Sequence, residues 1–170
     1  MRPVSSKDHQ PRTPGREIRG RTERHSGMLG EFFAARADDI DEDLLADGPY
    51  GRLPTVEAKG LTPVTIATLG EILGAGSYDS LVERAAQGPE AEPREGEDRD
   101  AGVLTIPREI REALATVDEL STVADRWAST EELTLDEWQV EDAIEVLREV
   151  RELARDALAA DRDLWYWWSL

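Results

Sequence analysis

The longest amphipathic pattern in the sequence, which runs from Thr134 to about Ala160, constrains the fold more than any other feature. On a helical wheel its apolar residues fall within one half of the helix and its charged residues occupy the other half. Thr134 and Glu137 match the capping box that starts a helix. The apolar half comprises Val140, Ala143, Val146, Leu147, Val150, Leu153, Ala154, Ala157 and Leu158. We therefore predict a long surface helix with one buried face.

An uncharged aromatic run follows this helix. It reads Leu-Trp-Tyr-Trp-Trp-Ser-Leu over 164–170, and its aromatic residues favour a strand, predicted over 164–169. Aromatic rings dominate many protein interfaces, so Trp165, Trp167 and Trp168 are candidate partner-binding residues. The alternative, which we favour, is that these rings form the core beneath the long helix, because exposed apolar patches of this size are rare on soluble monomers.

Shorter patterns predict the other elements of secondary structure. We expect strands at 31–35 and 103–106, and helices at 39–47, 62–73, 78–87 and 107–127. Asp38 or Asp39 is the expected N-cap of the first helix, and Thr62 followed by Pro63 is typical of the start of the second. The last of these helices should break near Thr116, where Thr116 and Glu119 match a capping box.

These elements predict a mainly α fold with a small β-sheet, of the α+β class. A chain of 170 residues is long enough for one domain with its own core. We expect residues 28–170 to form a single acidic, α-rich domain in which amphipathic helices pack on a short sheet formed near the N- and C-termini. Residues 89–102 contain no side chain larger than alanine that could enter a core, which predicts a mobile acidic loop.

Charge is distributed unevenly along the chain, whose formal net charge is −17. Residues 1–27 hold seven of the 20 basic residues and only three of the 37 acidic ones. Their polar, proline-containing sequence predicts a disordered basic N-terminal extension, interpreted either as an arm that touches a partner or nucleic acid or as a segment without a structural role. The remaining acidic body should repel nucleic acid and anionic lipid and attract a basic protein partner.

Motifs for catalysis or metal binding are missing from the sequence of the predicted domain. The chain has no cysteine, and both histidines, His9 and His25, precede residue 28, which excludes Ser-His-Asp, Cys-His and zinc sites from the domain. The carboxylates at 39–43 begin like a calcium loop, but Leu44 stands where that loop needs glycine. The glycine cluster at 74–77 lacks the Gly-Lys-Ser/Thr ending of a phosphate loop. We predict no catalytic, cofactor or metal site.

One short segment is a candidate polar site. Glu57 and Lys59 lie in a Val-Glu-Ala-Lys-Gly turn beside apolar segments, which is the one place where charge is expected close to the core. The alternative, which we favour, is an ordinary exposed ion pair worth at most about 1 kcal/mol.

Five segments carry a resemblance to known proteins. They are the Phe-Phe pair at 32–33, Thr-Val-Glu-Ala-Lys-Gly at 55–60, Ala-Thr-Leu-Gly-Glu-Ile-Leu at 67–73, Arg-Trp-Ala-Ser-Thr-Glu-Glu-Leu at 126–133, and the aromatic ending. Together they resemble a group of small, acidic, uncharacterised proteins of actinobacteria over roughly residues 28–170. The resemblance implies a single domain and assigns no function.

Three functions are compatible with these features. We favour a non-enzymatic interaction protein with a basic protein partner, of which an immunity- or antitoxin-like inhibitor is one concrete form. The alternatives are an enzyme or small-molecule binder that uses an Arg, Asp or Glu site, and a nucleic-acid mimic whose carboxylates imitate phosphates. The sequence shows neither a signal peptide nor a membrane span, and the lack of cysteine fits a reducing compartment, so we expect the protein in the cytoplasm and not in a membrane.

Overall fold

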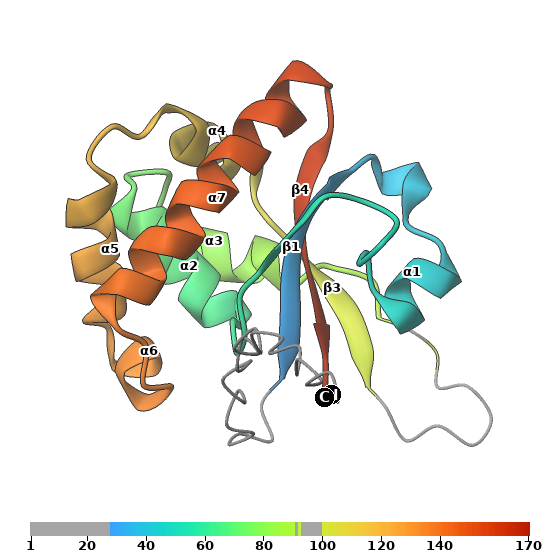
Figure 1. The fold of residues 1–170 in the computed structure, drawn as a ribbon, viewed down its shortest axis with the longest axis horizontal. Coiled ribbons are helices and arrows are strands. Elements are labelled where there is room, and N and C mark those ends of the chain that lie inside the picture. The colour runs from blue at the N-terminus through green and yellow to red at the C-terminus, as the bar shows by residue number, and fades with distance from the viewer. Residues whose placement is uncertain (1–27, 91, 93–99) are drawn as a thin grey trace, which may run out of the picture.

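A computed structural model, which describes residues 28–90, 92 and 100–170, shows an α+β fold built on one antiparallel sheet (Figure 1). The predicted extension at 1–27 and most of the loop predicted at 89–102 lie outside the described residues. The sheet has four strands in the order β2-β1-β4-β3. Their bounds are Leu29–Ala35 for β1, Thr55–Glu57 for β2, Ala101–Thr105 for β3 and Asp163–Ser169 for β4.

The C-terminal strand β4 lies at the centre of the sheet. It pairs with β1 along its whole length, from Leu29 opposite Ser169 to Ala35 opposite Asp163, and with β3 on its other side. This confirms that the sheet is formed by strands near the two ends of the domain. Ala101 and Gly102 belong to β3, and Glu90 forms a β-bridge with Gly102. The predicted bounds of the loop, 89–102, therefore include residues at both ends that pair with the sheet.

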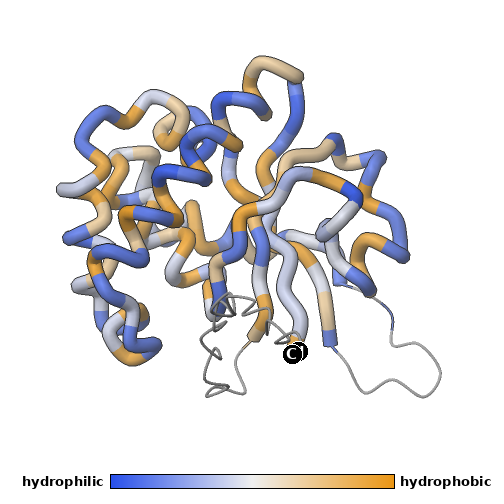
Figure 2. Tube along the Cα trace, in the orientation of Figure 1, coloured by the Kyte–Doolittle hydropathy of each residue, from blue (hydrophilic) through white to orange (hydrophobic). Residues whose placement is uncertain are grey.

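Helices cover the two faces of the sheet unequally (Figure 1). One face carries α2 (Pro63–Ile72), α3 (Tyr78–Ala85), α4 (Arg108–Thr116), α5 (Leu120–Ala128), α6 (Glu131–Leu135) and α7 (Val140–Ala159). The other face carries α1 (Glu42–Asp47), preceded by a 3-10 turn at Ala37–Asp39. Along the helices, short hydrophilic and hydrophobic stretches follow one another (Figure 2), as expected of helices that bury one face.

The aromatic strand is buried because β4 is covered on both faces. Successive side chains of a strand point to opposite faces. Tyr166 therefore lies in the large core under α2–α7, while Trp165 and Trp167 lie in the small core under α1. The two indoles of the small core also donate hydrogen bonds, from Trp165 Nε1 to Ala35 O at 3.1 Å and from Trp167 Nε1 to Leu45 O at 2.7 Å. An uncharged run is the composition expected of a strand buried on both faces.

Helix starts were predicted less well than helix faces. Thr62 caps α2 and Pro63 is its first residue, as predicted. The predicted N-cap of α1 is wrong, because Asp38 and Asp39 lie in the 3-10 turn and Asp41 is the cap, whose carboxylate accepts the Leu44 N–H at 2.8 Å.

Two predicted capping boxes are also wrong. Thr134 lies within α6, and α7 begins only at Val140, with Gln139 as its N-cap. The Thr116 hydroxyl donates back to Glu112 O within α4 and does not start α5. Both mistakes have one cause, since Glu is so frequent in this sequence that it follows a threonine at the capping-box spacing without capping a helix.

The Asp41 cap also predicts how stability depends on pH. Arg52 donates two hydrogen bonds to this carboxylate, at 3.0 and 2.8 Å. These bonds, with that from Leu44, lower the pKa of Asp41 from 3.8 to about 2. Because the folded pKa is the lower one, the stabilisation is complete well above pH 3.8 and is lost as the pH falls toward about 2.

We expect Asp41→Asn, which keeps a capping side chain, to lower the melting temperature at neutral pH. The difference from the natural protein should shrink as the pH is lowered through this range. Thermal unfolding followed by circular dichroism across the acid range measures it. A difference that stays constant down to about pH 2 would contradict the ion pair as its cause.

Candidate functional site

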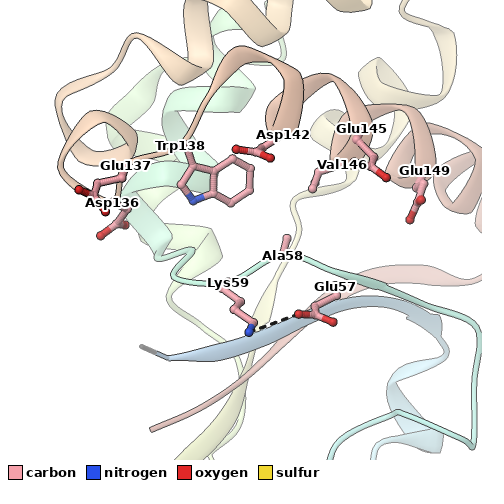
Figure 3. A pocket seen from close by; sticks show the side chains of 10 residues that line it. All are labelled: Glu57, Ala58, Lys59, Asp136, Glu137, Trp138, Asp142, Glu145, Val146 and Glu149. Carbon is pink, nitrogen blue, oxygen red and sulfur yellow. Dashed lines mark ion pairs between the residues drawn. The ribbon is translucent and has the colours of Figure 1, made fainter. Parts of the chain in front are cut away.

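A groove of about 530 Å³ lies between the end of β2 and the α6–α7 region (Figure 3). Its lining is dominated by carboxylates, and Lys59 is its one basic residue among the described residues. The carboxylates come from Glu57, Asp136, Glu137, Asp142, Glu145 and Glu149. Low-dielectric walls concentrate the field of such charges, so the groove attracts cations. We call it the acidic groove.

The floor of the acidic groove is a turn that is fixed by hydrogen bonds. Ala58 N–H donates to Gly30 O at 3.0 Å, which extends the pairing of β2 with β1. The Tyr166 hydroxyl donates to Ala58 O at 2.5 Å and accepts the Leu61 N–H at 3.2 Å. Burial raises the pKa of this phenol far above its usual range, so the hydroxyl keeps its proton. The turn that presents Lys59 is therefore tied to the central strand.

The opposite wall is the N-terminal half of α7. Glu145 and Glu149 are one helical turn apart and so share a face, which they present to the groove together with Asp142. Trp138 stands at the end of this wall with its ring centroid 5.5 Å from that of Trp127. Trp127 is fully buried and donates a hydrogen bond to Thr65 O at 3.0 Å. The end wall is thus connected to the large core.

Negative charge also accumulates on the strands below the groove. Glu31 of β1 lies directly opposite Glu57 of β2 in the antiparallel register. Partial burial raises the pKa of the Glu31 carboxyl, and repulsion from Glu57 adds to the rise. A cation bound near Glu57 would relieve this repulsion.

Both residues of the candidate polar site, Glu57 and Lys59, line the acidic groove. Lys59 Nζ lies 3.5 Å from Glu57 Oε1, and the two side chains are 51% and 50% exposed, so as an ion pair they contribute at most about 1 kcal/mol to stability. Sequence reasoning missed the carboxylates of the α6–α7 region. The spacing of Asp142, Glu145 and Glu149 places them on one helical face, but it does not distinguish them from the other exposed carboxylates of α7.

The three candidate partner-binding tryptophans do not line the acidic groove. Trp165 and Trp167 are buried, as the favoured alternative predicts, but they lie in the small core under α1. The prediction that they lie beneath the long helix is wrong, because α7 packs on the other face of the sheet, with Tyr166. Trp168 is partly buried and lines a second cavity of about 320 Å³, which we call the apolar pocket. The other apolar residues that line it include Met28, Leu61, Pro63, Ala86, Val103, Leu104 and Leu170.

Comparison with protein-family models, curated proteins and solved structures finds no match to this chain. The resemblance to actinobacterial proteins therefore stays a prediction. Within the described ranges, no cluster of three or more His, Cys, Asp or Glu side chains is arranged to hold a metal ion. Nor does any helix in that part of the chain combine the length and apolar character needed to cross a bilayer.

Proposed function

We propose that this protein is a non-enzymatic interaction protein that binds a basic segment of a partner protein in the acidic groove. The observation that carries the proposal is the convergence of six carboxylates from β2 and the α6–α7 region on one cavity. A groove of one sign raises the local concentration of oppositely charged ligand and speeds its association. The fixed Ala58–Leu61 turn supports the proposal further, because a preorganised site loses less entropy on binding.

An immunity- or antitoxin-like inhibitor is one concrete form of this function, since such a protein would cover a basic surface of its target. We place the interaction in the cytoplasm, where a chain without cysteine is at no disadvantage. The existence of a polar cavity also favours a second candidate, a binder of a small organic cation such as a polyamine. No single observation of the described residues favours the nucleic-acid mimic over these two.

Charge reversal in the groove tests the proposal. We expect the full chain to bind a labelled oligo-arginine peptide at low ionic strength and to release it as salt is added. Glu145→Lys together with Glu149→Lys should weaken binding by about tenfold or more, because both charges face the ligand. Fluorescence anisotropy titration measures the dissociation constants.

A matched control separates the groove from the overall charge of the protein. Glu71→Lys together with Asp125→Lys changes the net charge equally, and both residues are exposed on other helices outside the groove. We expect this control to bind almost as well as the natural chain. Equal weakening by both pairs, or no binding at low salt, would overturn the proposal. Binding of spermine without binding of the peptide would favour the second candidate.

A further inference from the structure

The apolar pocket and the acidic groove are lined by consecutive segments of one turn, residues 57–63, which we call the shared wall. Glu57, Ala58 and Lys59 line the groove, and Leu61, Thr62 and Pro63 line the pocket. The Cα atoms of residues 59 and 61 are at most about 7 Å apart, because only two peptide units separate them. A few residues of an extended partner segment span that distance.

The shared wall holds the two cavities in a fixed relation. Between them lies Gly60, whose N–H donates to Met28 O at 3.2 Å and whose φ of +76° favours glycine. The Tyr166 hydroxyl holds Ala58 O and the Leu61 N–H on either side of it. Met28 itself lines the apolar pocket, so the same hydrogen bonds position residues of both cavities.

The chemistry of the apolar pocket indicates what enters it. Of its described lining residues, Glu90 alone is charged, and the partly buried Trp168 ring forms part of a mostly apolar wall. Its volume of about 320 Å³ lies at the small end of ligand pockets, which suits one large side chain better than a whole cofactor. Aromatic and large aliphatic anchors seated in such pockets provide much of the affinity of protein interfaces.

We propose that the apolar pocket binds a large apolar side chain, such as Phe or Leu, from the same partner segment whose basic residues lie in the acidic groove. The inference rests on the proposed function and makes it specific. The partner carries a basic cluster next to an apolar anchor, and not basic residues alone. Glu90 at the pocket extends the complementarity of charge, because it adds to the negative field that receives the basic segment.

Two peptides that differ only in the anchor test the inference on the full chain. Each carries an oligo-arginine segment joined by a glycine spacer to either Phe or Ala. Burial of a Phe side chain predicts binding that is tighter by roughly tenfold to a hundredfold for the Phe peptide. Isothermal titration calorimetry at one salt concentration measures both affinities.

Filling the pocket should remove this advantage. Ala86 is exposed at the C-cap of α3 and lines the pocket, so Ala86→Trp can occupy the cavity from its rim without disturbing the core. Ala160 is an exposed alanine at the C-cap of α7, outside the pocket, so Ala160→Trp is the matched control. We expect Ala86→Trp to bind the two peptides equally and Ala160→Trp to keep the preference for Phe.

Methyl NMR of the natural chain gives a second measurement that needs no variant. The Phe peptide, and not the Ala peptide, should shift the methyl resonances of Leu61, Ala86 and Leu104. Equal binding of both peptides to the natural chain would overturn the inference and leave the proposed function intact. A Phe preference that survives Ala86→Trp would also overturn it, and failure of both peptides to bind would reject inference and function together.

Discussion

Replacing Gly30 by alanine is expected to destabilise the protein by about 3 kcal/mol, although the change adds a single methyl group. A Cβ atom at this position would lie 1.7 Å from the Tyr166 hydroxyl oxygen, 2.2 Å from Tyr166 Cζ and 2.7 Å from Ala58 O. Tyr166 cannot move aside easily, because it is fully buried and its hydroxyl bonds both Ala58 and Leu61. Equilibrium unfolding in urea measures the change in the free energy of unfolding.

A double-mutant cycle with Tyr166→Phe identifies the clash as the cause. Alone, Tyr166→Phe should cost about 1–3 kcal/mol, because it leaves two buried backbone groups of the Ala58–Leu61 turn without their partner. In combination with Gly30→Ala, the loss should be smaller than the sum of the two single losses by about 1 kcal/mol or more, since the nearest clashing atom is gone. Strict additivity would show that the destabilisation by Gly30→Ala arises elsewhere.

Replacing Trp127 by alanine should cost about 3–5 kcal/mol, which makes it the largest expected effect of a side-chain truncation here. The indole is fully buried in the large core, donates to Thr65 O and contacts Trp138. Its removal leaves a large cavity between α5, α2 and the start of α7. Urea unfolding measures the loss, and binding of the oligo-arginine peptide should weaken as well, because Trp138 loses its support.

Tyr50 provides the matched control for this truncation. It is an aromatic residue with 80% of its surface exposed, so Tyr50→Ala should change the free energy of unfolding by less than about 0.5 kcal/mol. A loss below about 1 kcal/mol for Trp127→Ala would contradict the packing of α5 against α2 and α7. If Trp127→Ala loses about 3–5 kcal/mol of stability but binds the peptide with unchanged affinity, the coupling of Trp138 to the acidic groove is contradicted.

The sequence predicts those parts of the fold that local periodicity determines. The apolar face of α7, the Thr62–Pro63 start of α2 and the strand at 164–169 follow from spacing and composition, and the structure confirms them. Leu158 is the exception on that face, because its side chain is exposed. Strand β2 has only three residues, Thr55–Glu57, which is too short for an alternating pattern to be recognised. It becomes a strand because the edge of β1 is available to it, and that is a tertiary property.

The sequence predicts only part of the candidate site, because the rest of the site also depends on tertiary structure. Glu57 and Lys59 stand out in the sequence because they are charged residues beside apolar segments. Glu145 and Glu149 resemble the other exposed carboxylates of α7 as long as the helix is considered alone. They become part of a groove only because α7 crosses above the Ala58 turn (Figure 3), and crossing geometry depends on how the whole core packs.

The central position of β4 has a consequence for how the protein is made. Among the described elements β4 is the last to leave the ribosome, yet it separates β1 from β3 and pairs with both. Until β4 has been synthesised, these two strands have no partner between them, so only the β1–β2 pair of the sheet can form before it. A premature stop codon before Asp163 would remove the strand that joins the two halves, so the product would be a substrate for proteolysis and not a shortened working protein.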